Sequence, residues 1–430
     1  VTRASATSMT GTIAFATLEQ AQEPYDVQVT NGEGLSSLLT NQINVNASPV
    51  FVTSAGTLGT ILNGQRTGVR KTVVATDPDS AANVTFELQS GSLPAGLALT
   101  SEGSEGGTAV ISGNATAVGT NTTSNFVLRA VDSASNTSSR AFSITINAPV
   151  SQSFTSSGTF AVPSGLTALD VLVVAGGGGG AMGATGSPGG GGGGGGAGGL
   201  IFMPSYPVTP GGTIAVTVGN YGSNNESAGA SASSPHKGQD SVFAGSPSPG
   251  IGQGGILTAK GGGGGGAYAG GAGGCGGSGG GGGAGSSSHP TTAGPANQST
   301  QPGNSGAYGF GNNGAAGNTG GAAGGGAGGG AATAGVGGGF GGGQGGTGKS
   351  YTIADGTTAV FYAGGGGGGQ GSPGQQSCGQ GGQGGAGDGG TGSGGQGQAA
   401  QANKGGGGGG GSYGGGQGNN GGKGIVIVRY

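Results

Sequence analysis

The stretch Asp170-Val-Leu-Val-Val-Ala175, followed directly by the glycine run Gly176–Gly180, decides how this chain is organised. An uninterrupted apolar segment rich in Val and Leu is typical of a strand that is buried on both faces. The same step from an apolar strand into polyglycine recurs at Ile256–Gly266 and at Val360–Gly369, and it is reversed before Ile425–Tyr430. Strands that alternate with glycine segments are therefore expected to build most of the chain after residue 150.

Composition excludes several classes of protein. Glycine accounts for 122 of 430 residues, far above the level of an ordinary globular domain. Charged residues make up only 6% and the net charge is -3, so we expect no nucleic-acid partner. No apolar run reaches the roughly 18 to 20 residues that span a bilayer, so we expect no membrane insertion. The two cysteines, Cys275 and Cys378, exclude a disulfide framework.

Residues 1–47 are predicted to form a short attachment segment. Thr12–Thr17 and Tyr25–Thr30 alternate with a period of two and are expected as strands, and Leu35–Leu39 is expected as one helical turn. This segment is too small to bury a core of its own. It either completes its core against a partner chain or forms a partly ordered tail.

Residues 48–149 are predicted to form an antiparallel β-sandwich. Short segments rich in Val, Ile, Thr and Phe are separated by turn residues, which is typical of such a fold. The expected strands are Val69–Ala75, Val84–Leu88, Ala109–Ser112, Asn125–Val131 and Ser139–Asn147.

Within this region, Ser92-Leu-Pro-Ala-Gly-Leu-Ala-Leu99, Ala109-Val-Ile-Ser-Gly113 and Phe126-Val-Leu-Arg-Ala-Val-Asp132 resemble the pattern of Ig-like and cadherin-like surface modules. Relatives of this kind bind calcium between tandem repeats, and Asp77, Asp79 and Asp132 supply hard oxygen ligands. The chain has a single repeat, however. We therefore favour these aspartates as turn residues that bond to the backbone, and we expect no cofactor.

Residues 150–430 are predicted to be a small β-sandwich that carries a bundle of polyglycine II-type helices, in an all-β chain with almost no α-helix. One isolated glycine run would stay flexible, because ordering it costs about 1 to 2 kcal/mol per residue. Many runs side by side can form extended helices of three residues per turn whose backbones bond laterally. In Gly379–Gly387, Gln380, Gln383 and Ala386 recur every third residue, which predicts one outward edge of such a helix.

The combination "GTFxVPxG…VVAGGGGG", "VTPGGTIAVTVG", "ILTAKGGGGGG" and "GGKGIVIVRY" resembles the glycine-rich domain of phage tail-fibre proteins over about residues 151–430. In receptor-binding adhesins of T-even-type phages, similar runs form a stack of polyglycine helices whose distal loops contact the host receptor. The resemblance therefore implies a virion structural protein for host attachment.

Receptor contacts are expected on the longer connectors, Asn220–Lys237 and Ser286–Phe310. The candidate residues there are aromatic or imidazole side chains, namely Tyr221, His236, His289, Tyr308 and Phe310. Exposed aromatic rings offer contact area at low entropic cost, although the same rings can instead plug bundle ends or sheet edges. Tyr268 and Tyr413 also interrupt glycine runs.

No catalytic chemistry is recognised. The two histidines are more than 50 residues apart, Asp240 and Asp388 are isolated, and no dyad or triad spacing is present. We therefore expect a non-enzyme.

The expected partners are other virion or tail proteins, bound through the N-terminal segment, and a host cell-surface glycan or protein. A homo-oligomer in the virion is expected, and Val1–Ser5 begins no apolar segment typical of a secretory signal. Alternatives are a bacterial cell-surface or matrix protein with an extracellular location, and a capsid or tail decoration protein without a receptor.

Overall fold

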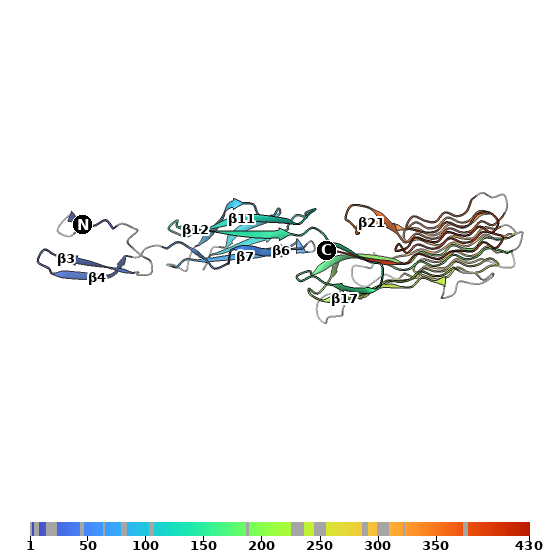
Figure 1. Cartoon of the computed structure of the whole chain (residues 1–430), viewed down its shortest axis with the longest axis horizontal. Coiled ribbons are helices and arrows are strands. Elements are labelled where there is room, and N and C mark those ends of the chain that lie inside the picture. The colour runs from blue at the N-terminus through green and yellow to red at the C-terminus, as the bar shows by residue number, and fades with distance from the viewer. Residues whose placement is uncertain are drawn as a thin grey trace. The chain divides into compact units, whose positions relative to one another are not determined.

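The computed structural model divides into two compact units, Val1–Ala148 and Pro149–Tyr430, and each is described by itself (Figure 1). Among the described residues there is no α-helix, and so no helix that is long and apolar enough to cross a membrane. The strands confirm the predicted all-β fold. The structure describes residues 2–3, 8–13, 24–43, 47–62, 65–78, 84–102, 107–185, 189–224, 236–244, 255–285, 291–298, 309–320, 323–372 and 377–430.

The first residues form two small antiparallel pairs. Strand β1 (Thr2–Arg3) pairs with β2 (Met9–Thr10), and β3 (Tyr25–Thr30) pairs with β4 (Ser36–Ile43). The predicted helical turn over Leu35–Leu39 is wrong. The Asn31 side chain accepts the backbone N–H groups of Glu33 and Leu35, which closes a tight turn and leads the chain back as β4.

The other strand expected in this segment, Thr12–Thr17, is not supported by its described part. Thr12 and Ile13 belong to no strand, and the remaining residues of that range lie outside the described residues.

The rest of the first unit is a sandwich of two four-stranded sheets, ordered β5-β7-β10-β9 and β6-β12-β11-β8. All neighbours are antiparallel except β6 and β12, which run parallel, so the expectation of a purely antiparallel sandwich needs this correction. The strands are β5 (Val50–Phe51), β6 (Gly56–Ile61), β7 (Val69–Thr76), β8 (Thr85–Gly91), β9 (Leu97–Glu102), β10 (Thr108–Gly113), β11 (Thr122–Val131) and β12 (Thr137–Ile146).

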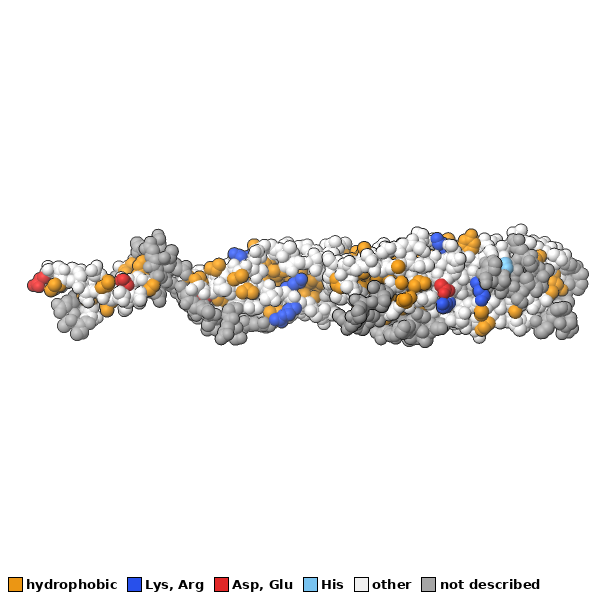
Figure 2. Space-filling model, turned by 90° about the horizontal axis from the view of Figure 1, so that it is seen from below, with side chains coloured by type: hydrophobic (Ala, Val, Ile, Leu, Met, Phe, Trp, Pro, Cys, Tyr) orange, Lys and Arg blue, Asp and Glu red, His pale blue; other side chains and the backbone are white. Residues whose placement is uncertain are grey.

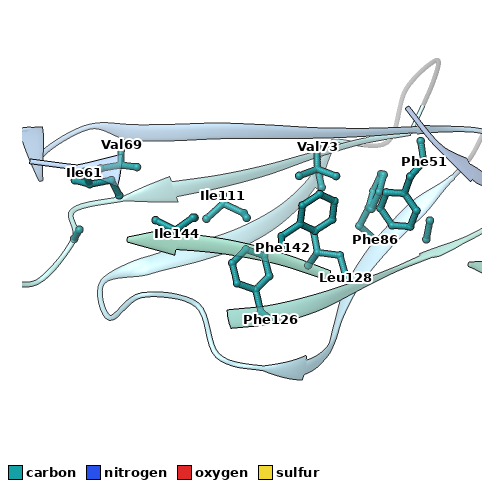
Figure 3. Packing of buried hydrophobic residues seen from close by; sticks show 14 of the residues in the cluster. Phe51, Ile61, Val69, Val73, Phe86, Ile111, Phe126, Leu128, Phe142 and Ile144 are labelled. Carbon is teal, nitrogen blue, oxygen red and sulfur yellow. The ribbon is translucent and has the colours of Figure 1, made fainter. Parts of the chain in front are cut away.

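Alternate residues of these strands fill the space between the two sheets. Phe126 and Leu128 on β11 are buried, as is Phe142 on β12, while their chain neighbours are less buried. Figure 3 shows this cluster, in which the Phe51 ring lies 5.8 Å from the Phe142 ring and 5.9 Å from the Phe86 ring, centroid to centroid. The apolar residues at every second position of these strands thus form one core between the two sheets.

The second unit begins with another sandwich. One sheet has the order β13-β23-β15-β16-β20 and the other β14-β17-β18-β19, and all their neighbouring strands are antiparallel. A separate hairpin joins β21 (Lys349–Tyr351) to β22 (Val360–Tyr362). The sheet strands are β13 (Ser151–Phe154), β14 (Gly158–Ala161), β15 (Ala168–Val174), β16 (Leu200–Pro207), β17 (Thr213–Thr217), β18 (Ser241–Ala244), β19 (Leu257–Ala259), β20 (Gly309–Phe310) and β23 (Ile425–Arg429).

The central strands β15 and β23 are buried on both faces, which explains their uninterrupted apolar sequence. Leu172 and Ile427 pair across the two strands and pack in one cluster with Ile353 of the connection between β21 and β22. The hairpin therefore covers the outer face of the five-stranded sheet.

The glycine segments pack side by side as threefold helices. In the run 190–199 every residue from Gly191 to Gly199 donates a backbone hydrogen bond of 2.7–3.0 Å, and every third residue donates to the same neighbouring run. The acceptors are Ala323, Gly326 and Gly329 in the first neighbour, Gly411, Gly408 and Gly405 in the second, and Gly266, Gly263 and Lys260 in the third. This rotation is the signature of a polyglycine II-type helix.

The same run accepts hydrogen bonds from three more neighbours, 175–184, 278–284 and 363–369, so that three plus three runs surround it. Glycine is required because a Cβ on Gly194 would lie 2.3 Å from the Gly366 carbonyl oxygen, and one on Gly195 would lie 2.1 Å from that of Gly178. The backbone of each run thus occupies the space that a side chain on the neighbouring run would need.

The predicted outward edge is correct in part. Gln380 and Gln383 are both exposed on the run 377–383. The chain then turns at Gly384 and Gly385, whose φ angles of 118° and 81° suit glycine, so Ala386 begins the next run rather than continuing the edge.

Candidate binding surface at the loop end of the glycine bundle

Connections between the glycine runs gather at two ends of the bundle, because successive runs alternately leave and re-enter the sandwich. One end is the sandwich itself, and the opposite end, here called the loop end, is formed in its described part by turns (Figure 1). The described turns of the loop end are Tyr268–Gly270, Gly339–Gly341, Thr391–Gly394 and Tyr413–Gly415. Residues 186–188, 225–235, 286–290, 321–322 and 373–376, each between two runs, lie outside the described residues.

Two buried polar side chains fix the turn Thr391–Gly394. The Gln370 side chain accepts the Gly392 N–H at 2.7 Å and donates to the Ser372 carbonyl at 2.9 Å. The Ser412 hydroxyl, which is fully buried, donates to the Gly395 carbonyl at 3.0 Å. Sequence reasoning did not single out these residues, although a lone polar residue that ends a glycine run was the available signal.

The Tyr268 ring packs against the first residue of the run 190–199. A Cβ on Gly190, the first residue of that run, would lie 2.7 Å from a ring carbon of Tyr268. This placement agrees with the plugging role that was considered for the aromatic residues. The following residue Ala269 has a φ of 71°, so the turn holds a side chain in the left-handed region.

The exposed groups of the described loop-end turns are hydroxyl and aromatic. Thr391 and Ser393 are exposed, and Phe340 keeps 56% of its surface accessible at the tip of its turn. None of these turns carries a charged side chain. Figure 2 shows the same trend over this unit, where charged side chains are few on the visible face. Such hydroxyl and aromatic groups suit stacking and hydrogen bonding.

Tyr221 and His236 lie on two adjacent outer runs of the bundle. The His236 Nδ1 atom is 3.3 Å from the Ser223 carbonyl oxygen, and a Cβ on Gly222 would touch the His236 carbonyl. Tyr221 is 49% exposed. The structure therefore brings these two predicted contact residues into one neighbourhood on the side of the bundle.

Phe310 belongs to the sandwich end instead. It is in β20, opposite Leu200, and the Lys349 ammonium lies 3.9 Å from its ring centroid in a cation–π contact. Residues 291–298 form a run of the bundle, in which Gly294 donates to Gly280 and accepts from Gly314. The prediction that Ser286–Phe310 is a single connector is therefore wrong. His289 and Tyr308 lie outside the described residues.

Asp132 acts as a turn residue in the first unit. One of its carboxylate oxygens accepts the N–H groups of Ala134 and Asn136, both at 2.8 Å, while the residue itself is buried. Asp77 is also buried, and Asp79 lies outside the described residues. Among the residues that the structure describes, no group of three or more His, Cys, Asp or Glu side chains is placed to hold a metal ion.

Comparisons with known proteins match both parts of the chain. Residues 154–430 match the model of a family described as "Glycine-rich domain", and residues 49–147 match one described as "Putative Ig domain". The solved structure "Crystal structure of titin M3 domain" is 14% identical, and the match covers 23% of this chain and 96% of that chain with a TM-score of 0.17. No curated protein matches the chain.

Proposed function

This chain belongs to the glycine-rich domain family, and from that premise we propose that it is a non-enzymatic adhesin of a phage tail fibre. In this proposal the glycine bundle is a stiff support, the loop end contacts a glycan or protein on the host cell surface, and the protein is part of the virion. The observation that carries the proposal is the separation of roles within the second unit. A laterally bonded lattice holds a set of short turns, which in their described part expose the side chains of Phe340, Thr391 and Ser393.

The energetics favour such a division. Each backbone hydrogen bond contributes a net stabilisation of about 0.5–1.5 kcal/mol, and the runs of the bundle make many of them. The network is made by backbone groups, so the exposed side chains of the turns can change without loss of the lattice. Contact residues held on a rigid support also lose little conformational entropy on binding.

The exposed leucines of the N-terminal hairpin support the proposal that the first unit binds a partner protein. Strands β3 and β4 form only a two-stranded sheet, yet Leu35, Leu38 and Leu39 are 70%, 55% and 53% exposed. An isolated two-stranded hairpin is marginally stable in water. In the proposed virion these leucines are covered by other tail proteins or by further copies of this chain.

The test is binding of the purified, fluorescently labelled chain to a panel of bacterial strains. A loop-end variant combines Phe340→Gly, Thr391→Gly and Ser393→Gly. Its matched control changes exposed residues of a turn at the sandwich end, Gln401→Gly and Ala402→Gly. We expect the unmodified chain to bind at least one strain, the loop-end variant to lose at least tenfold in affinity, and the control to keep it.

Circular dichroism melting of both variants verifies that the fold is intact. Equal binding by the two folded variants would contradict the loop end as the contact surface. Absence of binding to every strain would instead favour a decoration or matrix protein, in which the glycine bundle serves only as a scaffold.

A further inference from the structure

A pocket of about 440 Å³ lies on the outer face of the five-stranded sheet, under the connection between β21 and β22. Its volume falls in the range of small-molecule sites. Strands β15, β16 and β23 supply its floor, and Ser350–Ile353, Gly356 and Ala359 supply its rim. It is formed entirely by the second unit and is separate from the loop end.

The sheet places the floor residues on one face. Asp170 pairs with Arg429, and two residues along each strand Leu172 pairs with Ile427. Because alternate residues of a strand point to the same face, the two charged residues share the face on which Leu172 packs beneath the hairpin. Phe202 on β16 pairs with Leu172 and completes this row.

One wall of the pocket is aromatic. The rings of Phe202 and Tyr351 lie 4.7 Å apart, centroid to centroid, at an angle of 35°. Burial raises the pKa of Tyr351 to about 12, so its hydroxyl stays protonated in neutral solution. The wall thus offers an apolar face together with a neutral hydroxyl group.

Another part of the pocket lining is charged. Among the described residues the Arg429 guanidinium takes part in no hydrogen bond or ion pair, although Asp170 is its register partner. One oxygen of Asp170 accepts the Ser205 N–H at 3.0 Å. The guanidinium lies close against Gly356, where a Cβ would come within 2.1 Å of one of its nitrogens. Contact with Gly356 therefore positions the Arg429 guanidinium, while its N–H groups remain available for a ligand.

We propose that this pocket binds a mono- or disaccharide that carries a carboxylate. Sugar rings present C–H groups to aromatic faces and hydroxyl groups to polar side chains. The planar guanidinium of Arg429 matches a carboxylate in a two-pronged geometry. Asp170 and the exposed hydroxyl groups of Ser350 and Thr352 accept or donate hydrogen bonds to the sugar hydroxyls. A neutral sugar leaves the Arg429 donors without an anionic partner.

The test is isothermal titration calorimetry on the full chain. The probes are galacturonate, glucuronate and N-acetylneuraminate, each compared with its uncharged counterpart, galactose, glucose and N-acetylmannosamine. We expect at least one acidic sugar to bind at least tenfold more tightly than its counterpart. Arg429→Gln should weaken that binding at least tenfold. The control Lys423→Gln, which removes a half-buried cation outside the pocket, should leave it unchanged.

A second variant guards against an indirect effect of losing Arg429. Ala359 is exposed on the rim, so Ala359→Trp fills the pocket without altering the charged residues, and it should abolish binding as well. The loop-end variant should bind the sugar normally, which separates this proposal from the proposed host contact. Failure of all three acidic sugars to bind, or unchanged binding by folded Arg429→Gln, would overturn the proposal.

Discussion

Replacing Gly366 by alanine tests whether the glycine bundle is held by close contact between backbones. Gly366 lies at the meeting point of three runs: it donates to Gly195, accepts from Gly328 and packs against Gly408. An alanine Cβ would lie 2.1 Å from the Gly408 carbonyl oxygen and 3.1 Å from the Gly195 nitrogen. Side-chain carbons do not approach backbone atoms below 3.0 Å, so a neighbouring run must move by roughly 0.9 Å.

The expected loss follows from that movement. Overpacking of a close-packed interior costs about 1–3 kcal/mol. Displacing the run around Gly408 also weakens its hydrogen bonds to Gly178 and from Gly195, each of which contributes about 0.5–1.5 kcal/mol. We therefore expect Gly366→Ala to destabilise the second unit by about 2–4 kcal/mol. For a unit of this size, that loss lowers its melting temperature by several degrees.

The matched control is Gly339→Ala at the loop end. No heavy atom lies within 4 Å of the position of its Cβ. The substitution there should be neutral or stabilise by about 0.4–1 kcal/mol, because alanine restricts the unfolded chain. Differential scanning calorimetry of the full chain measures both effects, and hydrogen exchange of the segments 261–266 and 364–369 reports on the lattice directly. Equal melting temperatures for the two variants, or exchange at random-coil rates in these segments, would refute the packed bundle.

Three further predictions follow from other parts of the chain. Removing calcium with a chelator should leave the melting temperature of the first unit unchanged, because backbone N–H groups already occupy a carboxylate oxygen of Asp132; a clear decrease would indicate a bound ion. The raised pKa of Tyr351 favours the protonated form in the folded state, so its contribution to stability is complete below about pH 10 and is lost as the pH rises toward about 12; urea unfolding of Tyr351→Phe should show a smaller decline, of which the part due to the raised pKa of Tyr362 remains. The double variant Leu38→Asp and Leu39→Asp should lower the mass measured by light scattering if the hairpin joins copies of this chain, whereas an unchanged mass would point to a different partner or none.

The scaffold of the second unit was predictable because its signals are local. Strands such as β15 and β23 are continuous apolar segments, and their two buried faces explain that composition. The threefold packing of the glycine runs followed from the absence of side chains together with the number of runs. The order of neighbours in the lattice was not predictable, because the glycine runs are nearly identical in sequence and carry no marks of which run lies beside which.

The errors have identifiable physical causes. Leu35–Leu39 has the composition of a helical turn, but the two bonds to the Asn31 side chain start a hairpin before it. The stretch Ser286–Phe310 contains no two consecutive glycines, yet residues 291–298 enter the bundle. An outer run needs room for close contact only on the side that faces its neighbours. Gln370 and Ser412 were overlooked because a single polar residue beside a glycine run resembles an interruption rather than a turn support.

The rotation of hydrogen-bond partners along the run 190–199 also restricts how the protein can evolve. Each neighbour is met once in every three residues, so inserting one or two residues would direct every later donor to the wrong neighbour. Length can change without loss of register only by three residues, about 9 Å along the axis, and the surrounding runs must lengthen together. The lengths of the turns are not restricted in this way. Among descendants of this sequence, insertions and deletions should therefore concentrate in the turns, while run lengths differ by multiples of three.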